Sequence, residues 1–215
     1  MVNRGAPLEA AVARTKTPRT GAAACAYAEL MLDGQIRQAV RDELIAIHGK
    51  PPVTLLRDEL GLCLGATRVD VAAVNGQLTG CEINGDRDRL SRLPHQVELY
   101  GRVLDVAVLI TEPKCARKAV AHVPQWWGIW QVEERDGSAR IEQVRQTGTN
   151  PGSDPLSVAQ LLWRDEVYAE LQAREAAASL ARATRWRLWE ALAALLPAVE
   201  LGQVVRARLK ARQDW

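Results

Sequence analysis

Residues 68–84 read RVDVAAVNGQLTGCEIN and hold the clearest fold signal in the chain. Two short runs of apolar and β-branched residues, 68–74 and 77–83, flank the dipeptide Asn75-Gly76. This dipeptide is the one most typical of a tight β-hairpin turn. The segment therefore predicts two antiparallel strands joined by a short turn.

Each predicted strand carries one carboxylate, Asp70 in the first and Glu82 in the second. A charge inside an apolar strand is unfavourable unless it is paired or binds a cation, so both require an explanation. Because side chains alternate along a strand, a two-residue turn places Asp70 opposite Cys81 and turns Glu82 to the other side. A three-residue loop, from Asn75 to Gln77 with a glycine bulge, places Asp70 opposite Glu82 instead. Both registers are open at this point.

Outward from the hairpin, hydrophobic residues change from a strand period to a helix period and back. The predicted elements are a helix over 22–48 interrupted near Gly34, a helical stretch over 86–103 in which Pro94 opens a second segment, a buried strand over 105–111, a helix over 113–123, a strand over 126–134 and an edge strand over 139–146. This order predicts an α/β fold in which a mixed sheet is flanked by helices.

Amino-acid composition divides the chain into an N-terminal arm, a core, a linker and a C-terminal extension. The first 21 residues are polar and basic and predict a flexible arm, whereas 22–146 form the α/β core. Residues 147–154 (TGTNPGSD) predict a linker. Residues 155–215 are rich in Ala, Leu and Arg and predict an α-helical C-terminal extension of two or three helices.

Composition narrows the class of protein. The chain has 215 residues, 47% of them hydrophobic, and a formal net charge of +2, which argues against a strongly basic nucleic-acid coat or an acidic tail. No apolar run approaches the roughly 20 residues of a membrane helix, and the N-terminus has no signal-peptide core, so we expect a cytoplasmic protein without a membrane partner. The four cysteines lack disulfide or zinc spacing and are expected to be buried apolar residues.

Further polar residues extend the carboxylate pair. Asp70, Glu82 and the carbonyl of Ile83 are hard oxygen donors of the kind that Mg²⁺ prefers, and Glu59 offers a third carboxylate. Gln96 and Tyr100 are four residues apart and share one helix face. Two arginines, Arg89 and Arg92, extend that face toward the N-terminus of the helix.

Together, Glu59, RVD (68–70), EIN (82–84) and QVELY (96–100) resemble the PD-(D/E)XK nuclease superfamily, with the QxxxY helix of its exonuclease-helicase branch. Over about residues 23–215, the amino-acid sequence is still more similar to a small family of uncharacterised bacterial nuclease-like proteins within that superfamily. The resemblance implies a restriction-endonuclease-like fold and metal-dependent hydrolysis of DNA, with RNA less favoured, in repair or in defence against foreign DNA. It leaves a homodimer and a complex with a partner protein equally open.

The resemblance also implies roles for individual residues. Asp70 and Glu82 would bind Mg²⁺ or Mn²⁺, and Glu59 would hold or orient the metal from a preceding helix. Gln96 and Tyr100 would position the substrate backbone or the site itself.

One residue departs from the family pattern, because Asn84 stands where the family has a lysine. An ammonium there would orient the attacking water and stabilise the transition state, whereas an amide supplies no charge. One interpretation is that another cation reaches the site; the nearest are Arg87, Arg89 and Arg92. The other is a catalytically impaired scaffold that binds nucleic acid or protein.

Simpler explanations exist for the same residues. Asp70 and Glu82 could be strand-end carboxylates paired with Arg68 or Arg87, and the Gln96 and Tyr100 face could pack against the sheet. Trp126 and Trp127 could stack on bases, although core packing is more typical. From residue 182 onward seven cations face three acids, which fits either a phosphate-contacting face or a solvated one.

Overall fold

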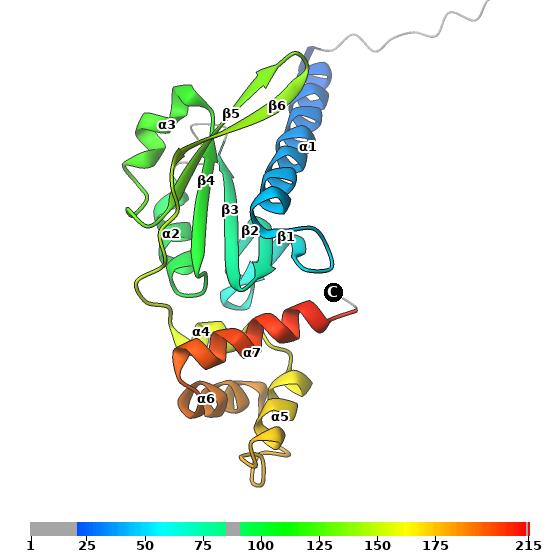
Figure 1. The fold of residues 1–215 in the computed structure, drawn as a ribbon, viewed down its shortest axis with the longest axis vertical. Helices are drawn as coiled ribbons and strands as arrows, with labels where there is room; N and C mark the ends of the chain where they lie inside the picture. The colour runs from blue at the N-terminus through cyan, green and yellow to red at the C-terminus, as the bar shows by residue number, and fades with distance from the viewer. Residues whose placement is uncertain (1–20, 85–90, 214) are drawn as a thin grey trace, which may run out of the picture.

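The structure, a computed structural model, describes residues 21–84, 91–213 and 215, with side chains from Asp33 onward (Figure 1). It contains one six-stranded sheet in the order β1-β2-β3-β4-β5-β6. The strands are β1 Leu55–Leu62, β2 Thr67–Asn75, β3 Gln77–Asn84, β4 Val106–Thr111, β5 Gly128–Arg135 and β6 Ser138–Arg145. The β3–β4 and β4–β5 pairs are parallel and the outer pairs are antiparallel, which confirms the predicted mixed α/β sheet.

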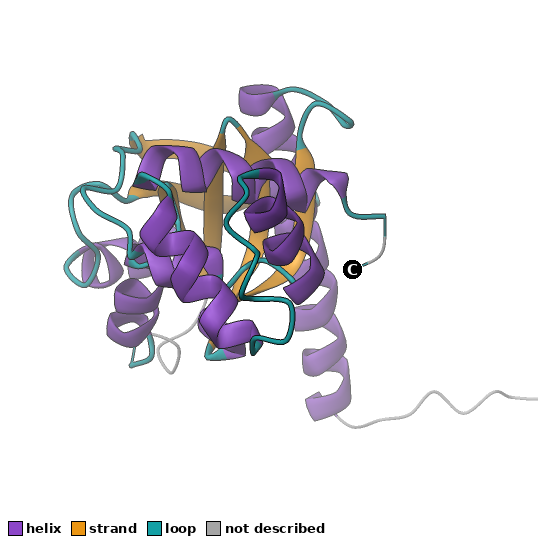
Figure 2. Cartoon of the chain, turned by 90° about the horizontal axis from the view of Figure 1, so that it is seen from below, coloured by secondary structure: helices purple, strands orange, loops and turns teal. Residues whose placement is uncertain are grey.

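Helices cover both faces of the sheet. They are α1 Gly21–His48, α2 Leu93–Gly101, α3 Pro113–Val120, α4 Pro155–Ala159, α5 Arg164–Ala173, α6 Arg185–Leu195 and α7 Ala198–Ala211. The long α1 lies along one side of the sheet, and the four C-terminal helices gather at one end of the strands (Figure 1). Seen from below, these C-terminal helices lie in front of the sheet (Figure 2). None of the described helices is both long and apolar enough to cross a membrane.

The two faces of the sheet form two hydrophobic clusters. On the α1 face, Val40 and Leu44 of α1 pack with Ile110 and Trp130 of the sheet. The other cluster joins sheet residues with residues of the C-terminal helices; its fully buried members include Leu62, Leu109, Leu171, Leu188, Leu201 and Leu209. Burying each such side chain contributes roughly 1.5–3 kcal/mol. The C-terminal helices therefore complete the core of the sheet.

Residues 147–154, predicted as a linker, are held against the loop that follows α2. The side-chain amide of Asn150 donates to the carbonyl oxygens of Gly101 and Leu104, both at 2.7 Å. The backbone N–H of Asp154 donates to the carbonyl of Arg102 at 2.9 Å. The Asp154 carboxylate also accepts the N–H groups of Leu156 and Ser157 and so caps α4. This segment is consequently fixed to the core at both ends.

The β2–β3 hairpin adopts the three-residue register. Its Cα pairs run from Val71 opposite Cys81 to Asn75 opposite Gln77, with Gly76 at the tip at φ 66°. The ladder ends at Val71 and Cys81, so Asp70 and Glu82, which the three-residue loop was expected to place opposite each other, are not paired across the strands. Gly76 suits the tip because a positive φ carries little steric cost without a Cβ atom.

Two sequence predictions about helices are wrong. The first predicted helix is not interrupted near Gly34, because α1 continues from Gly21 to His48. An interior glycine costs only about 1 kcal/mol relative to alanine, which neighbouring turns and packing offset. The C-terminal extension has four helices where two or three were expected, since the short α4 is set apart by the Asp154 cap. The described part of the 86–103 stretch forms α2 from Leu93, with Pro94 in its first turn as predicted.

The strand β1 was missed by the sequence analysis. Its residues, LLRDELGL, place three charges in the centre and show no apolar alternation. Charged residues are typical of edge strands, where they discourage pairing with another chain. Here β1 is the edge of the sheet beside β2. Glu59, expected on a preceding helix, therefore lies on a strand, and the helical prediction for it is wrong.

Candidate functional site

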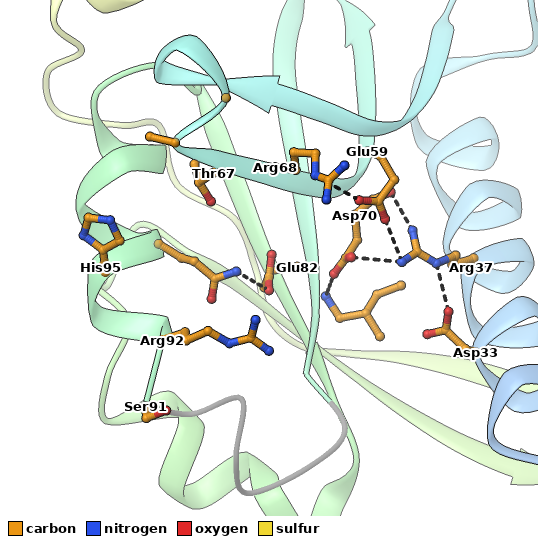
Figure 3. A pocket seen from close by; sticks show the side chains of 14 residues that line it. Asp33, Arg37, Glu59, Thr67, Arg68, Asp70, Glu82, Ser91, Arg92 and His95 are labelled. Carbon is orange, nitrogen blue, oxygen red and sulfur yellow. Dashed lines mark hydrogen bonds and ion pairs between the residues drawn. The ribbon is translucent and has the colours of Figure 1, made fainter. Parts of the chain in front are cut away.

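A polar cavity of about 580 Å³ opens where β2, β3, α1 and α2 meet. Its lining includes four carboxylates and three guanidinium groups: Asp33, Glu59, Asp70 and Glu82, with Arg37, Arg68 and Arg92. Figure 3 shows Asp70 on the side of the cavity that faces α1 and Glu82 on the side that faces α2. The three main candidate carboxylates of the sequence analysis thus line one cavity.

Asp70 lies where the β2–β3 ladder opens. The last paired residues are Val71 and Cys81, and beyond them the Asp70 carboxylate accepts the backbone N–H of Ile83 at 2.7 Å. Burial raises the pKa of Asp70 above its ordinary value, although the Ile83 N–H and the charge of Arg37 both act to lower it. Asp70 is therefore a partly desolvated carboxylate at the end of a sheet, fixed by a backbone donor.

Arg37 of α1 is the cation that compensates this part of the cavity. Its guanidinium lies 3.0 Å from Asp70 Oδ1, 3.0 Å from Glu59 Oε1 and 3.1 Å from Asp33 Oδ2. Arg37 also donates to the backbone carbonyl of Asp70 at 2.9 Å (Figure 3). Burial acts to lower the pKa of Arg37, but the three carboxylates outweigh it and raise the pKa. Arg68, proposed as the partner of Asp70, pairs with Glu59 instead, at 3.6 Å.

The sequence analysis missed Arg37, although a signal was present. Arg37, Val40 and Leu44 stand at helical spacings of three and four, and Val40 and Leu44 are fully buried. A cation on the apolar stripe of an amphipathic helix requires a buried anion as its partner. That anion could not be identified from sequence, because it lies 33 residues away on a strand.

Glu82 is held by the two residues of the QxxxY pattern. Its Oε1 accepts from the side-chain amide of Gln96 at 2.6 Å, and its Oε2 accepts from the Tyr100 hydroxyl at 2.5 Å. The same hydroxyl lies 2.7 Å from the carbonyl oxygen of Arg68. Burial, and then the charge of Glu82, raises the pKa of Tyr100, so the hydroxyl keeps its proton. Both carboxylate oxygens of Glu82 therefore have a fixed orientation.

Tyr100 is fully buried and stacks on Trp127 at a centroid separation of 5.7 Å. A buried hydroxyl cannot touch a substrate, so of the two roles expected for Tyr100 only the positioning of the site agrees with the structure. The simpler explanation holds at the same time, because Tyr100 and Trp127 belong to the core beneath the cavity. Trp127 is accordingly a core residue and unavailable to bases.

Glu59 has a backbone conformation that is rare for a residue with a side chain. Its φ is 52°, and such a conformation costs on the order of 1 kcal/mol. The conformation interrupts the alternation of β1, because Asp58 and Glu59 both face α1, where they pair with Arg41 and Arg37. The Glu59 side chain remains 46% exposed. Strain of this kind is concentrated at functional sites, which favours a role for Glu59 in the cavity.

Asn84, at the position where the nuclease resemblance implies a lysine, is 3% exposed and does not line the cavity. Its Nδ2 has no hydrogen-bond partner within the described part of the chain. Of the three arginines considered as substitute cations, Arg87 and Arg89 lie outside the described residues. Arg92 lines the cavity, is exposed and points toward Glu82 (Figure 3). Arg92 has no ion pair with any residue that the structure describes.

The donor types suit a hard divalent cation, since Glu59, Asp70 and Glu82 all offer carboxylate oxygens. Their present orientation does not form a cage: the described residues contain no group of three or more His, Cys, Asp or Glu side chains placed to hold one metal ion. Asp70 and Glu59 turn to Arg37, and Glu82 turns to Gln96 and Tyr100. For a metal ion to bind at Asp70, the guanidinium of Arg37 therefore has to move away from the Asp70 carboxylate.

Parts of this chain are similar to known proteins. Protein cII of Enterobacteria phage P4 is 23% identical over 119 residues, which cover 55% of this chain and 45% of that protein. The chain thus matches less than half the length of this relative. Among solved structures, the SPO1766 protein of unknown function from Silicibacter pomeroyi has a TM-score of 0.43 and 16% identity, over 70% of this chain and 94% of that chain. Residues 28–214 match the family model described as Bacteriophage P4 protein cII, and the chain belongs to that family.

Proposed function

We propose that the protein is a nucleic-acid-processing enzyme that hydrolyses phosphodiester bonds in DNA with a divalent metal ion at this cavity. The observation that supports the proposal most directly is the fixed orientation of Glu82. Gln96 and Tyr100 hold both of its oxygens at the cavity that Asp70 also lines. Burying a carboxylate and a tyrosine hydroxyl together costs free energy that an apolar core would not. Holding Glu82 in one orientation in this way is typical of a pre-organised functional site.

Asp70, Glu82 and Glu59 would hold Mg²⁺ or Mn²⁺, together with the carbonyl of Ile83. When bound, the metal supplies charge that polarises a phosphate oxygen and lowers the pKa of a bound water. The protein groups orient the carboxylates. The N–H of Ile83 orients Asp70, and Gln96 and Tyr100 orient Glu82. Arg37 keeps Asp70 and Glu59 compensated before the metal arrives.

Substrate binding falls to the exposed arginines of the cavity. Arg92 has no ion pair among the described residues, and Arg68 is 67% exposed with only a 3.6 Å contact to Glu59. A planar guanidinium can bind a phosphate group through two parallel hydrogen bonds. These two side chains would hold the phosphate backbone over the carboxylates, with Arg92 as the charge nearest to Glu82 (Figure 3).

A second candidate function is binding of nucleic acid without cleavage, and a specific observation favours it. Arg37 already neutralises Asp70 and Glu59, and Asn84 contributes no charge to the cavity. Such a site could bind a DNA backbone through Arg68 and Arg92 without hydrolysing it. This alternative and the enzyme make different predictions for the same assay.

The test is cleavage of end-labelled DNA and RNA strands with Mg²⁺ or Mn²⁺, by the native chain and by Asp70→Ala and Asn84→Lys. Asp42→Ala is the matched control, because Asp42 is a carboxylate on the exposed surface of α1 outside the cavity. Cleavage by the native chain and by Asp42→Ala, lost in Asp70→Ala, supports the enzyme. Cleavage that appears only in Asn84→Lys supports the binding function. Activity that survives in Asp70→Ala contradicts the proposed site.

A further inference from the structure

A second polar–aromatic surface lies beside the candidate site, on the C-terminal helices. Its members, called here the Trp–Arg face, are Trp163, Arg185, Trp189, Arg212 and Trp215, with Arg57 of β1 next to them. Five of these residues, all but Arg57, line a cavity of about 360 Å³. No residue of the proposed carboxylate site lines this cavity.

Two of the three tryptophans on this face, Trp163 and Trp215, are exposed in a way that core packing does not explain, whereas Trp189 is buried. Trp163 is 46% exposed and Trp215 is 39% exposed, whereas Trp127 and Trp130 are at most 2% exposed. Leu64, at the rim of the same cavity, is 57% exposed. Large apolar side chains gathered on an open surface indicate a binding site.

Cations hold these rings in place and give the face its charge. The guanidinium of Arg212 lies 4.2 Å from the Trp163 ring centroid and 4.9 Å from that of Trp215, while Arg212 is itself bound to Glu166. Arg57 lies 4.4 Å from the Trp215 ring. Among the described residues, no Asp or Glu side chain lines the cavity, and neither Arg57 nor Arg185 has an ion pair. The face therefore combines fixed rings with uncompensated positive charge.

The Trp–Arg face and the candidate site are separated by a single turn. The β1–β2 connection, η1 Cys63–Gly65, contributes Cys63 and Leu64 to the second cavity. Its other end, Gly65 followed by Ala66 and Thr67, lines the carboxylate cavity. Since consecutive Cα atoms are about 3.8 Å apart, the two cavities lie within a few nucleotides of each other.

We infer that the Trp–Arg face binds single-stranded DNA and leads it across the β1–β2 turn to the carboxylate cavity. Unpaired bases can stack on Trp163 and on the guanidinium planes, whereas the bases of a duplex are already stacked on one another. The free charges of Arg57 and Arg185 suit the phosphate backbone. The route to the cavity depends on the proposed function, but binding at the face does not, and the two are measured separately.

The experiment is fluorescence anisotropy of a labelled oligonucleotide, titrated with the full chain in a buffer with a chelator so that no cleavage occurs. Trp163→Ala and Trp215→Ala are expected to weaken single-strand binding about tenfold each. Trp186→Ala is the matched control: Trp186 is also 46% exposed on α6, but it bonds to Glu190 and does not line the cavity. Circular dichroism melts identify any variant that fails to fold. If a tryptophan variant does not fold, Arg185→Gln is tested in its place.

The salt dependence supplies a second readout. Arg57→Gln and Arg185→Gln should each reduce the slope of log affinity against log salt by about 0.7.

Unchanged affinity in the folded Trp163→Ala, Trp215→Ala and Arg185→Gln proteins overturns the inference. Equal affinity for duplex DNA with the same variant effects overturns the preference for single strands. If the variants bind DNA normally but lose self-association or the binding of another protein, the face belongs to a protein partner. That result also overturns the inference. Tight single-strand binding without cleavage supports the face even if the proposed hydrolysis fails.

Discussion

Arg37 is the residue on which the electrostatics of the candidate site depend. One guanidinium serves three carboxylates and one backbone carbonyl, and its side chain is 23% exposed. Two of those carboxylates, Asp70 and Glu59, are the ones proposed to hold a metal ion. On that proposal the Arg37 guanidinium and a metal ion would compete for the same oxygens, which makes Arg37 the first residue to vary.

Replacing Arg37 with Gln leaves the partly buried Asp70 carboxylate without its ion-pair partner, whereas Glu59 keeps its contact with Arg68. We expect Arg37→Gln to lower the free energy of unfolding by about 2 kcal/mol in chelator. We also expect Mn²⁺ to raise the melting temperature of Arg37→Gln more than that of the native chain, because the oxygens are then free for the metal. Thermal melts by circular dichroism with and without Mn²⁺ measure both effects.

Arg41→Gln is the control for this experiment. Arg41 lies one turn further along α1 and pairs with Asp58 outside the cavity, with both side chains more than a third exposed. Its loss should cost less than about 1 kcal/mol and should leave the response to Mn²⁺ unchanged. Equal Mn²⁺ responses in Arg37→Gln, Arg41→Gln and the native chain would show that Arg37 does not occupy a metal position.

One part of the pH dependence of stability comes from Asp70. Burial raises its pKa above the ordinary 3.8, so the folded state holds a proton that the unfolded state has already released. The stability that this group contributes is complete below 3.8 and is lost as pH rises through the folded-state pKa. Asp70→Asn cannot titrate. In chelator, the unfolding free energy of the native chain minus that of Asp70→Asn should therefore fall as pH rises.

Urea unfolding of the two proteins at several pH values between about 3.5 and 7 measures this difference. Comparing the variant with the native chain at each pH removes the titration of the remaining groups. A difference that rises with pH would mean that Arg37 and the Ile83 N–H dominate over burial, and the sign argued here would be wrong.

Close packing between β3 and the loop after α2 shapes the sheet beneath the cavity. A Cβ atom on Gly80 would lie 2.5 Å from Leu104 Cδ1 and 3.1 Å from Val69 Cγ1. Leu104 is fully buried, so its side chain has to repack within the core to accept this atom. Gly80→Ala should therefore destabilise the fold by roughly 1–3 kcal/mol in chemical unfolding.

Gly61→Ala in β1 is the matched change, since its Cβ would meet only Gly65 Cα at 3.9 Å. It should alter stability by less than about 0.5 kcal/mol. Combining Gly80→Ala with Leu104→Ala should cost less than the sum of the two single changes, because the smaller side chain makes room for the methyl group. Strict additivity would show that the predicted clash does not exist.

The elements that could be predicted from sequence are those with a local signal. The β2–β3 hairpin has an alternating pattern around Asn75-Gly76, and Gln96 and Tyr100 share a face through their spacing alone. The strand β1 has no such signal, because an edge strand is half exposed and accepts charges such as those of Asp58 and Glu59. The link from Arg37 to Asp70 depends on tertiary packing of α1 on the sheet, which no local pattern encodes.

Across the whole molecule, the C-terminal helices and the sheet share one hydrophobic cluster. The predicted division into an α/β core and a helical extension follows the sequence composition, but the extension covers apolar residues that the sheet would otherwise expose. Trp127, which directly precedes β5, and Leu188 of α6 are both fully buried in this cluster. The Trp–Arg face and the carboxylate cavity consequently keep a fixed relation through the same packed core.

The order of the strands in the sheet is also their order along the chain. During synthesis on the ribosome, each strand after the first thus meets a partner that is already made, although the parallel strands β4 and β5 can pair only after α2 and α3 have formed their crossovers. The apolar face that carries Leu62 and Leu109 is completely covered only when residues 155–209 have emerged. The nascent chain is therefore most vulnerable to aggregation and to proteases in the interval between the completion of β6 and the docking of α7.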